Sequence, residues 1–309
     1  MKTMRELMAN LSAQPNYQAS LERTYQEVRD YPEVQSFIHQ HADQLSSQMI
    51  TNSLSKLNEY VREMKAIKEG RPGQNPGFVP HLFINQGYID ITYVPTQAYL
   101  DQEAKRKRQS LMDNRMMAQD VRLAQLDQFD LSSANRQRLF DEVLNFIQAY
   151  EENPRQAKGL FITGPFGVGK TYLLGAMANL LVDKGIGVTM LHYPSFASEI
   201  KASIANNTTL DMVNQIKNVP VLIIDDIGAE SNSAWLRDEV LTVLLEHRMK
   251  ESLATFFTSN FNMAEIEHHL ATTRDAVERV KAKRLMERFY YLAKEMTFNG
   301  ENRRRQATN

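Results

Sequence analysis

Residues 164–171 of this 309-residue chain read Gly164-Pro165-Phe166-Gly167-Val168-Gly169-Lys170-Thr171. The predicted architecture of the C-terminal part follows from this stretch. It fits the pattern G-x-x-x-x-G-K-[ST] without a mismatch, and it lies between a short apolar run, residues 159–163, and a helical pattern, residues 172–184. Glycines in such a loop let successive backbone N–H groups point at phosphate oxygens, and the helix that follows adds its positive N-terminal end. The sequence therefore predicts a strand, a phosphate-binding loop and a helix, in that order.

Two residues of the loop and two later aspartates have the chemistry that ATP and Mg²⁺ require. Lys170 would neutralise the β- and γ-phosphates, and the hydroxyl of Thr171 would hold Mg²⁺. After the apolar run 221–224, Asp225 would hold the metal through its water shell and Asp226 would orient or deprotonate the attacking water. The alternative is a strand-end turn with two solvated aspartates, which the phosphate loop upstream disfavours.

A further apolar run, residues 255–259, is followed by the polar amide of Asn260. In a parallel sheet the ends of the strands converge on the ligand crevice. We therefore expect Asn260 to hydrogen-bond the γ-phosphate or the attacking water and so to report which nucleotide is bound. The alternative is that Asn260 caps a helix that begins near Met263.

Short apolar runs alternate with helical patterns in the C-terminal part of the chain. The expected strands are residues 159–163, 188–192, 219–224 and 255–259, and the expected helices are residues 172–184, 195–205 and 235–250. This alternation predicts an α/β fold, with a parallel sheet and helices on both of its faces.

The N-terminal part has a different pattern. Residues 70–80 read GRPGQNPGFVP, which neither a helix nor a strand would accept. Residues 1–69 carry apolar side chains at helical spacing, and alternation around Asn85-Gln86-Gly87 predicts a hairpin. We expect a small, mainly helical N-terminal domain with a hairpin (residues 1–100), a linker (101–130) and the α/β domain (131–309).

Composition limits the possible functions. Lys and Arg number 36 and Asp and Glu 37, so a net charge of −1 gives no overall basic surplus of the kind that duplex-DNA binders carry. The chain has no cysteine, which excludes disulfides, thiol catalysis and thiolate zinc sites and suits a reducing cytosol. No apolar run approaches the roughly 20 residues of a membrane span, so we expect a cytoplasmic protein without membrane contact.

Beyond these patterns, the chain resembles the AAA+ ATPases, and among them the bacterial replicative-helicase loaders of the DnaI/DnaC type. The resemblance rests on the stretches GPFGVGKTYLLGAMAN, PVLIIDDIGAE, WLRDEVL, TFFTSNF and KRLMERFYYLAKEMTFNGENRR. It implies an AAA+ P-loop domain that binds ATP with Mg²⁺ through Walker A at residues 164–171 and Walker B at residues 221–226, with Asn260 as sensor 1. It also implies slow ATP hydrolysis that partners stimulate.

In AAA+ assemblies an arginine from a neighbouring subunit completes the ATP site. The resemblance places it in Lys283-Arg284-Leu285-Met286-Glu287-Arg288-Phe289, with Arg288 as the first choice and Arg284 as the second. An arginine supplied in this way adds positive charge to the transferring phosphoryl group only when subunits are stacked. The alternative is a solvated basic face of a helix.

Two features depart from the family pattern. Walker B ends in Asp225-Asp226 rather than Asp-Glu, a variation that the loader subfamily shares and that suggests modest turnover. N-terminal domains of the DnaI type hold zinc through cysteines and a histidine, whereas here only His39, His41 and His81 remain, and they make a poor structural site. We therefore expect no zinc.

The resemblance implies three partners: a hexameric replicative helicase held by the N-terminal domain, single-stranded DNA, and further copies of the AAA+ domain. An amphipathic face with Met4, Leu7, Met8 and Leu11 would suit a partner, although such a stripe also suits a core. Candidates for DNA contact are the basic stretch 274–288, Arg303-Arg304-Arg305, and Lys201 with Phe196. A merely solvated basic surface is the alternative.

The expected function is ATP-dependent loading of the replicative helicase onto single-stranded DNA, as a component of the primosome in replication initiation or restart. A transposition helper ATPase of the IstB type is the alternative within the clade, but the long N-terminal unit and the ending Gly300-Glu301-Asn302-Arg303-Arg304 favour the loader. A P-loop kinase or GTPase is disfavoured because the chain has no N-K-x-D signature. An adaptor that binds ATP and scarcely hydrolyses it stays open.

Overall fold

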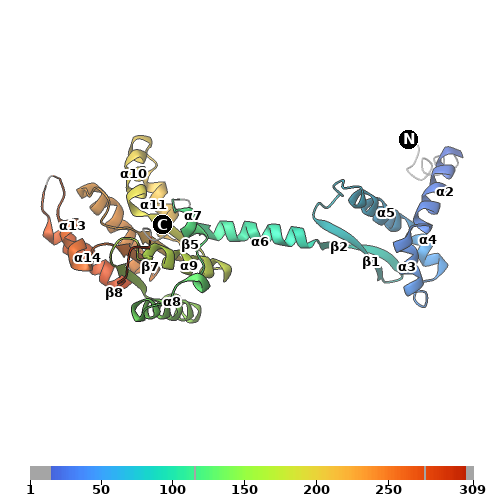
Figure 1. The fold of residues 1–309 in the computed structure, drawn as a ribbon. Coiled ribbons are helices and arrows are strands. Elements are labelled where there is room, and N and C mark those ends of the chain that lie inside the picture. The colour runs from blue at the N-terminus through green and yellow to red at the C-terminus, as the bar shows by residue number, and fades with distance from the viewer. Residues whose placement is uncertain (1–14, 115, 275, 304–309) are drawn as a thin grey trace. The chain divides into compact units, whose positions relative to one another are not determined.

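The chain divides into two units, Met1–Lys105 and Arg106–Asn309, each with its own hydrophobic core. A computed structural model describes residues 15–114, 116–274 and 276–303 (Figure 1). Helix α6 (Gln97–Leu111) runs across the limit between the units and has no buried side chain.

The N-terminal unit contains helices followed by a hairpin, as predicted. Its elements are α2 (Pro15–Arg29), α3 (Pro32–Gln40), α4 (Ser47–Asn52), α5 (Leu54–Lys68), β1 (Phe78–Asn85) and β2 (Tyr88–Pro95). The exclusion of a strand from residues 70–80 is wrong at its end, because β1 begins at Phe78 and Pro80 is accepted in a strand of a two-stranded hairpin. The strands pair antiparallel, and the turn residues Gln86 and Gly87 both have positive φ, 45° and 88°. A turn of this type matches the twist of the flanking strands.

The core of this unit lies between the helices and one face of the hairpin. Ile89 of β2 is 1% exposed, and its backbone N–H donates to the hydroxyl of Ser53 at 2.7 Å. The rings of Tyr31 and Tyr60 pack edge to face, with centroids 6.3 Å apart. Helices and hairpin therefore share one core.

Within the described residues, the C-terminal unit is built on a six-stranded sheet in the order β3-β5-β6-β7-β4-β8, and every neighbouring pair is parallel. The strands are β3 (Met112–Asp113), β4 (Gly159–Thr163), β5 (Val188–His192), β6 (Val221–Asp225), β7 (Ala254–Ser259) and β8 (Ala293–Thr297). The helices are α7 (Gln119–Arg122), η1 (Leu126–Gln128), α8 (Ala134–Glu152), α9 (Lys170–Asp183), α10 (Tyr193–Ser203), η2 (Ile204–Asn206), α11 (Thr209–Lys217), η3 (Leu236–Leu241), α12 (Thr242–Lys250), α13 (Met263–Ala271) and α14 (Arg279–Leu292).

The sheet is buried on both faces, as parallel sheets are. Side chains alternate along β6, so that Leu222 and Ile224 join the cluster formed by α10 to α14, while Val221 and Ile223 join the cluster formed by α8 and α9. The predicted α/β fold, with helices on both faces of a parallel sheet, is confirmed.

The two edge strands have no counterpart in the sequence prediction. β8 lies beyond the last strand expected from the sequence, and all its residues pair with β4. β3 is two residues long and pairs with β5. It lies in residues 101–130, the expected linker, which also hold the end of α6, α7 and η1. Strand pairing at an edge depends on a distant partner, so the local pattern does not reveal it.

One buried arginine ties together the end of the sheet opposite the phosphate loop. Arg248 of α12 is 0% exposed. Its guanidinium donates to the carbonyls of Val219 (2.8 Å), Lys217 (3.2 Å) and Ala254 (2.7 Å) and to the hydroxyl of Thr255 (2.8 Å). These oxygens lie at the starts of β6 and β7, so one side chain fixes α12 against both strands.

Replacing Arg248 with Met is expected to lower the free energy of unfolding by about 3 kcal/mol, because several buried oxygens lose their donor. Denaturant unfolding followed by the fluorescence of Trp235, the single tryptophan, reports on the C-terminal unit. The control is Lys250→Met on the same helix, which removes only an exposed ion pair with Glu246 and should hardly move the midpoint. Equal shifts for both variants would contradict the role given to Arg248.

Candidate nucleotide-binding site

The carboxyl ends of β4, β6 and β7 meet at one edge of the sheet. Thr163 of β4 lies opposite Ser259 of β7, and β7 pairs in turn with β6. Because the three strands are parallel, the residues that follow them start from neighbouring points. The phosphate loop, Asp225 with Asp226, and Asn260 thus surround one cavity of about 720 Å³.

The glycines of the phosphate loop allow a close approach of the C-terminal segment. Gly167 has a φ of 76°, and a Cβ there would overlap the side-chain oxygen of Asn302. A Cβ at Gly164 would overlap the carbonyl oxygen of Phe298. Glycine at these two positions therefore allows the C-terminal segment to pack directly against the phosphate loop.

Lys170 is the first residue of α9 and is 7% exposed. Its ammonium donates to the carbonyls of Gly164 (2.7 Å) and Pro165 (3.0 Å) and to Oδ1 of Asn260 (2.8 Å). The cation is thus held beside the backbone of the phosphate loop and in contact with the residue that follows β7.

Asp225 is a buried carboxylate at the end of β6, 3% exposed. Its Oδ1 accepts hydrogen bonds from the hydroxyls of Thr171 (2.8 Å) and Thr258 (2.6 Å). Burial raises the pKa of the Asp225 carboxyl, and the two hydroxyls offset part of that rise. A positive charge at this point would favour the ionised carboxylate.

Asp226 has a left-handed backbone, with a φ of 58°. Its N–H donates to the hydroxyl of Thr258 (2.9 Å), and its Oδ1 accepts from the amide of Asn260 (3.2 Å). Nε2 of His192 lies 3.9 Å from Oδ2. Non-glycine residues adopt this backbone conformation seldom, and such strain concentrates at functional sites.

The amide of Asn260 therefore contacts a cation and a carboxylate of the cavity, since its oxygen accepts from Lys170 and its nitrogen donates to Asp226. The alternative role, capping of the next helix, is wrong. Asn262 is the N-cap of α13 and forms a capping box with Glu265.

Several residues that line the cavity belong to no sequence motif. They include Met117, Gln128, Asp130, Arg136 and His192. Arg303, which belongs to the C-terminal ending and is a predicted candidate for DNA contact, also lines the cavity. These residues come from the expected linker, from α8, from the end of β5 and from the C-terminal segment. Only the charges of some of them could have drawn attention to these positions.

Arg136 connects three of these segments and is 5% exposed. Its guanidinium donates to the carbonyls of Asp130 (2.6 Å) and Val168 (2.9 Å) and lies between two aromatic rings, 4.4 Å from the centroid of Phe129 and 5.0 Å from that of Phe298. The guanidinium thus stabilises the phosphate loop through its hydrogen bond to Val168, while the two aromatic rings hold the cation in place.

Arg288 and Arg284 lie on α14. Arg288 forms an ion pair with Glu246 (3.0 Å) and also contacts the carbonyl oxygen of Arg284, whose side chain is exposed. In the part of the chain that the structure describes, neither arginine lines the nucleotide cavity of its own subunit.

One expectation for DNA contact is wrong. Phe196 is 2% exposed and packs in the core 6.3 Å from Tyr193, because helical spacing places it on the inner face of α10. It has no free face on which a base could stack. Lys201 is half-buried and donates to the carbonyl of Ser231 at 2.9 Å. Other expected contact residues lie outside the described ranges: Met4, Leu7, Met8, Leu11, Arg304 and Arg305.

Among residues 15–114, 116–274 and 276–303, no three side chains of His, Asp or Glu form a group that could hold a metal ion, and His39, His41 and His81 form no such group. In the same ranges, no helix has the length and apolar character needed to cross a bilayer.

Comparison with known protein families assigns both units. Residues 1–93 match the family model of the primosomal protein DnaI N-terminus, and residues 94–309 match that of the IstB-like ATP binding protein. The chain thus contains an ATP-binding domain preceded by a domain of the DnaI type.

Three relatives extend this finding. The chain is 39% identical to the replicative helicase loader DnaI of Bacillus subtilis (strain 168) over 305 residues, which cover 96% of this chain and 97% of the relative. A crystal structure of DnaI, 40% identical, covers 64% of this chain and 99% of that one with a TM-score of 0.56. The structure of the DnaC helicase loader, 23% identical, covers 59% and 100% with a TM-score of 0.50 and shares the fold.

These similarities favour the loader over the transposition helper, because the similarity to DnaI includes the N-terminal unit and nearly the whole chain. The chain belongs to the DnaI family of replicative helicase loaders, with an ATP-binding domain of the AAA+ fold.

Proposed function

We propose that this chain is an ATP-dependent loader that places a hexameric replicative helicase on single-stranded DNA. In this proposal ATP and DNA order several copies around the helicase, and hydrolysis releases it. The observation that carries the proposal is the similarity to the replicative helicase loader DnaI over nearly the whole chain. The Asn260 amide, which contacts both Lys170 and Asp226, supports its dependence on ATP. Such an activity belongs in the cytoplasm, where a bacterial chromosome lies.

The residues around Asp225 suit Mg²⁺. The hydroxyl of Thr171 lies 2.8 Å from the Asp225 carboxylate, and hard oxygen donors of this kind are the ligands that Mg²⁺ prefers. The pKa of this buried carboxyl is raised, so a bound cation would offset the cost of its charge. When bound with ATP, Mg²⁺ would neutralise charge on the β- and γ-phosphate oxygens.

Lys170 would bind the β- and γ-phosphates. In the structure its ammonium is satisfied by two loop carbonyls and by Asn260, and phosphate oxygens are stronger acceptors than carbonyls. Binding of ATP would therefore draw Lys170 away from these neutral partners. Asn260 would then be free to contact the γ-phosphate, so its position would depend on the bound nucleotide.

Asp226 would accept the proton of the attacking water. Its left-handed backbone and the hydrogen bond from its backbone N–H to the Thr258 hydroxyl fix the residue at the end of β6, and the carboxylate lies beside Asn260. A proton would pass from water to Asp226 as the water oxygen bonds to the γ-phosphorus, while the bond from that phosphorus to the β–γ bridging oxygen breaks and ADP leaves with this oxygen. Nε2 of His192 lies 3.9 Å from the other oxygen of this carboxylate, Oδ2.

An arginine of a second copy would complete the site. Arg288 and Arg284 lie on an α14 face away from the cavity of their own subunit, as a residue that serves a neighbour must. We assign Arg288 first and Arg284 second. The ion pair of Arg288 with Glu246 would open when the copies assemble.

The N-terminal unit would hold the helicase, since the family name of residues 1–93 is that of DnaI and this unit has a core of its own. Basic side chains of α14 and of the segment before it would contact single-stranded DNA or a neighbouring copy. This contact would be local, because the whole chain has a net charge of −1.

Lys170→Ala is expected to weaken ATP binding roughly tenfold to a hundredfold, because a charge-assisted contact to phosphate is lost. Titration with a fluorescent ATP analogue measures the affinity. The matched control is Lys184→Ala at the other end of the same helix, where the lysine pairs with Glu151 and lies far from any phosphate. Unchanged affinity in the Lys170 variant would remove the phosphate role.

Asp226→Asn keeps the size of the side chain but removes the base. We expect nearly unchanged ATP affinity and a loss of hydrolysis of about 10²- to 10⁴-fold, measured as phosphate release. With ATP, this variant should also retain the helicase longer than the unaltered protein does. Release at the same rate would show that hydrolysis is not needed and would favour an adaptor.

The full chain, mixed with its replicative helicase and ATP, is expected to form a complex that size-exclusion chromatography with light scattering detects. The Lys170→Ala protein should still bind the helicase, because the contact lies in the N-terminal unit. A chain of residues 106–309 should not. The absence of any complex under all nucleotide conditions would refute the proposed partner.

A further inference from the structure

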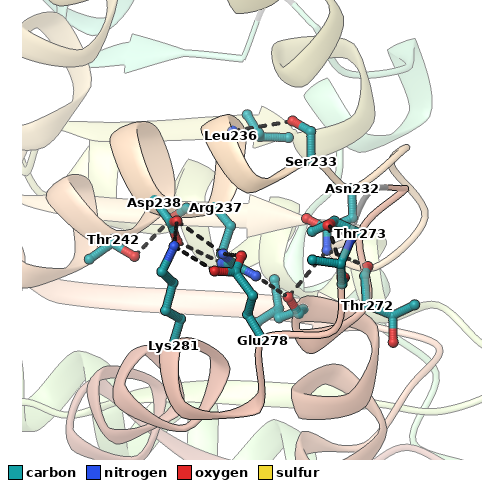
Figure 2. Close-up of polar contacts among 12 residues, drawn as sticks. Asn232, Ser233, Leu236, Arg237, Asp238, Thr242, Thr272, Thr273, Glu278 and Lys281 are labelled. Atoms are coloured by element: carbon teal, nitrogen blue, oxygen red, sulfur yellow. Dashed lines mark hydrogen bonds and ion pairs between the residues drawn. The ribbon is translucent and has the colours of Figure 1, made fainter.

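A second buried arginine lies outside the nucleotide cavity. Arg237 has a side chain that is 0% exposed and belongs to η3, a π-helical turn. Its guanidinium donates to both carboxylate oxygens of Asp238 (2.6 and 2.9 Å), to Glu278 (2.6 Å) and to the carbonyl of Leu270 (3.1 Å) (Figure 2). Its hydrogen bonds to the carboxylates of Asp238 and Glu278 raise the pKa of Arg237, so it stays charged.

Lys281 completes this group, as Figure 2 shows. Its ammonium lies 2.9 Å from Asp238 and 2.7 Å from Glu278. Two cations thus face two carboxylates, and the network is balanced in charge. Glu278 immediately precedes α14 and Lys281 lies in its first turn, so four charged side chains join η3 to the start of α14.

Asn232 fixes the end of α13, the helix that precedes α14. Its amide nitrogen donates to the carbonyls of His269 (2.9 Å), Leu270 (3.3 Å) and Thr272 (3.0 Å), at the end of α13. The Leu270 carbonyl is also an acceptor for Arg237. Residues 232–238 therefore contact both the end of α13 and the start of α14.

The stretch 232–238 follows Walker B closely in the sequence. It begins a few residues after Asp226, and between them lies the buried Glu230, which accepts from the N–H of Gly228 (2.7 Å) and contacts His269 (2.9 Å). A π-helical turn is rare and persists where its surroundings determine it, often at functional sites. Here the hydroxyl of Thr242 satisfies the carbonyl of Arg237 within the turn.

We propose that Arg237 is a positioning residue for the arginine that one copy supplies to the ATP site of the next. Through Glu278 and Lys281 it fixes the start of α14 to the segment that follows Walker B. Arg284 and Arg288 lie about one and two helical turns beyond Lys281. The inference rests on the proposed function, in which one of these arginines acts in a neighbouring subunit.

A rigid helix carries a shift at its start to every residue along it. A misplacement of about 1 Å at reacting groups can cost about a hundredfold in rate. Loss of the network should therefore impair the donated arginine and leave the nucleotide site of the same subunit intact. This separation distinguishes positioning from a purely structural role.

The test uses the full-length protein with single-stranded DNA and helicase present. Arg237→Met removes the centre of the network, and the milder Glu278→Gln and Lys281→Met each remove one charge near the surface. The matched control is Lys294→Met, whose lysine is as exposed as Lys281 and forms an ion pair with Glu142 on the far side of the unit. We expect hydrolysis to fall roughly tenfold or more for Arg237→Met and about threefold for the milder variants, with unchanged affinity for a fluorescent ATP analogue.

Mixing experiments then locate the defect. Lys170→Ala protein binds ATP poorly but carries intact α14 arginines, so it should restore hydrolysis when mixed with any network variant. Protein in which Arg284 and Arg288 are both Ala should not restore it. The reference pair, Lys170→Ala with that double variant, must regain activity.

Each outcome decides between the two proposals. If the reference pair regains activity and the network variants do not respond to Lys170→Ala, the role of Arg237 is refuted while the donated arginine stands. If the reference pair stays inactive, the proposal that α14 donates an arginine to a neighbouring subunit is refuted, and the positioning role of Arg237 is refuted with it. Reduced ATP affinity in Glu278→Gln and Lys281→Met would also refute positioning, because their own nucleotide sites would then be damaged.

Discussion

The hydrogen bond between Lys170 and Asn260, 2.8 Å long, is the interaction on which the architecture of the site depends. It joins two residues 90 positions apart, and it exists only because β4 and β7 pair in parallel with Thr163 opposite Ser259. A shift of one residue in that register would turn the residues after β7 to the other face of the sheet. The register between β4 and β7 therefore determines which side chains meet in the cavity.

The same register explains how charged groups can be buried at this edge. An isolated ammonium or carboxylate would be costly in the interior. Lys170 is surrounded by oxygen acceptors, and Asp225 receives two hydroxyl donors. The two hydroxyls that Asp225 contacts are neutral, and burial raises the pKa of its carboxyl. A buried carboxylate with hydroxyl partners, next to a lysine at the phosphate loop, is suited to a ligand that brings both phosphate and a metal ion.

The sequence predicted those parts of the fold that depend on local pattern. The phosphate loop, the strands around it and the carboxylates after β6 each have a signature within a few residues. Edge strand β8 and the packing of Arg136 between Phe129 and Phe298 depend on residues far along the chain, and no local pattern encodes such contacts. Phe196 illustrates the opposite error, because an aromatic residue at helical spacing looks the same in a core as on a surface.

The two fully buried arginines show why burial alone does not indicate a role. Arg248 donates to neutral oxygens at the starts of β6 and β7, which are neighbouring strands of one sheet. Its hydrogen bonds therefore stabilise the packing of α12 on that sheet. Arg237 is bound by two carboxylates on different elements, one of which opens α14. Ion pairs in such a setting add little net stability but favour one geometry over others. The charge-balanced network is therefore the better candidate for a part that sets position, whereas the neutral one serves stability.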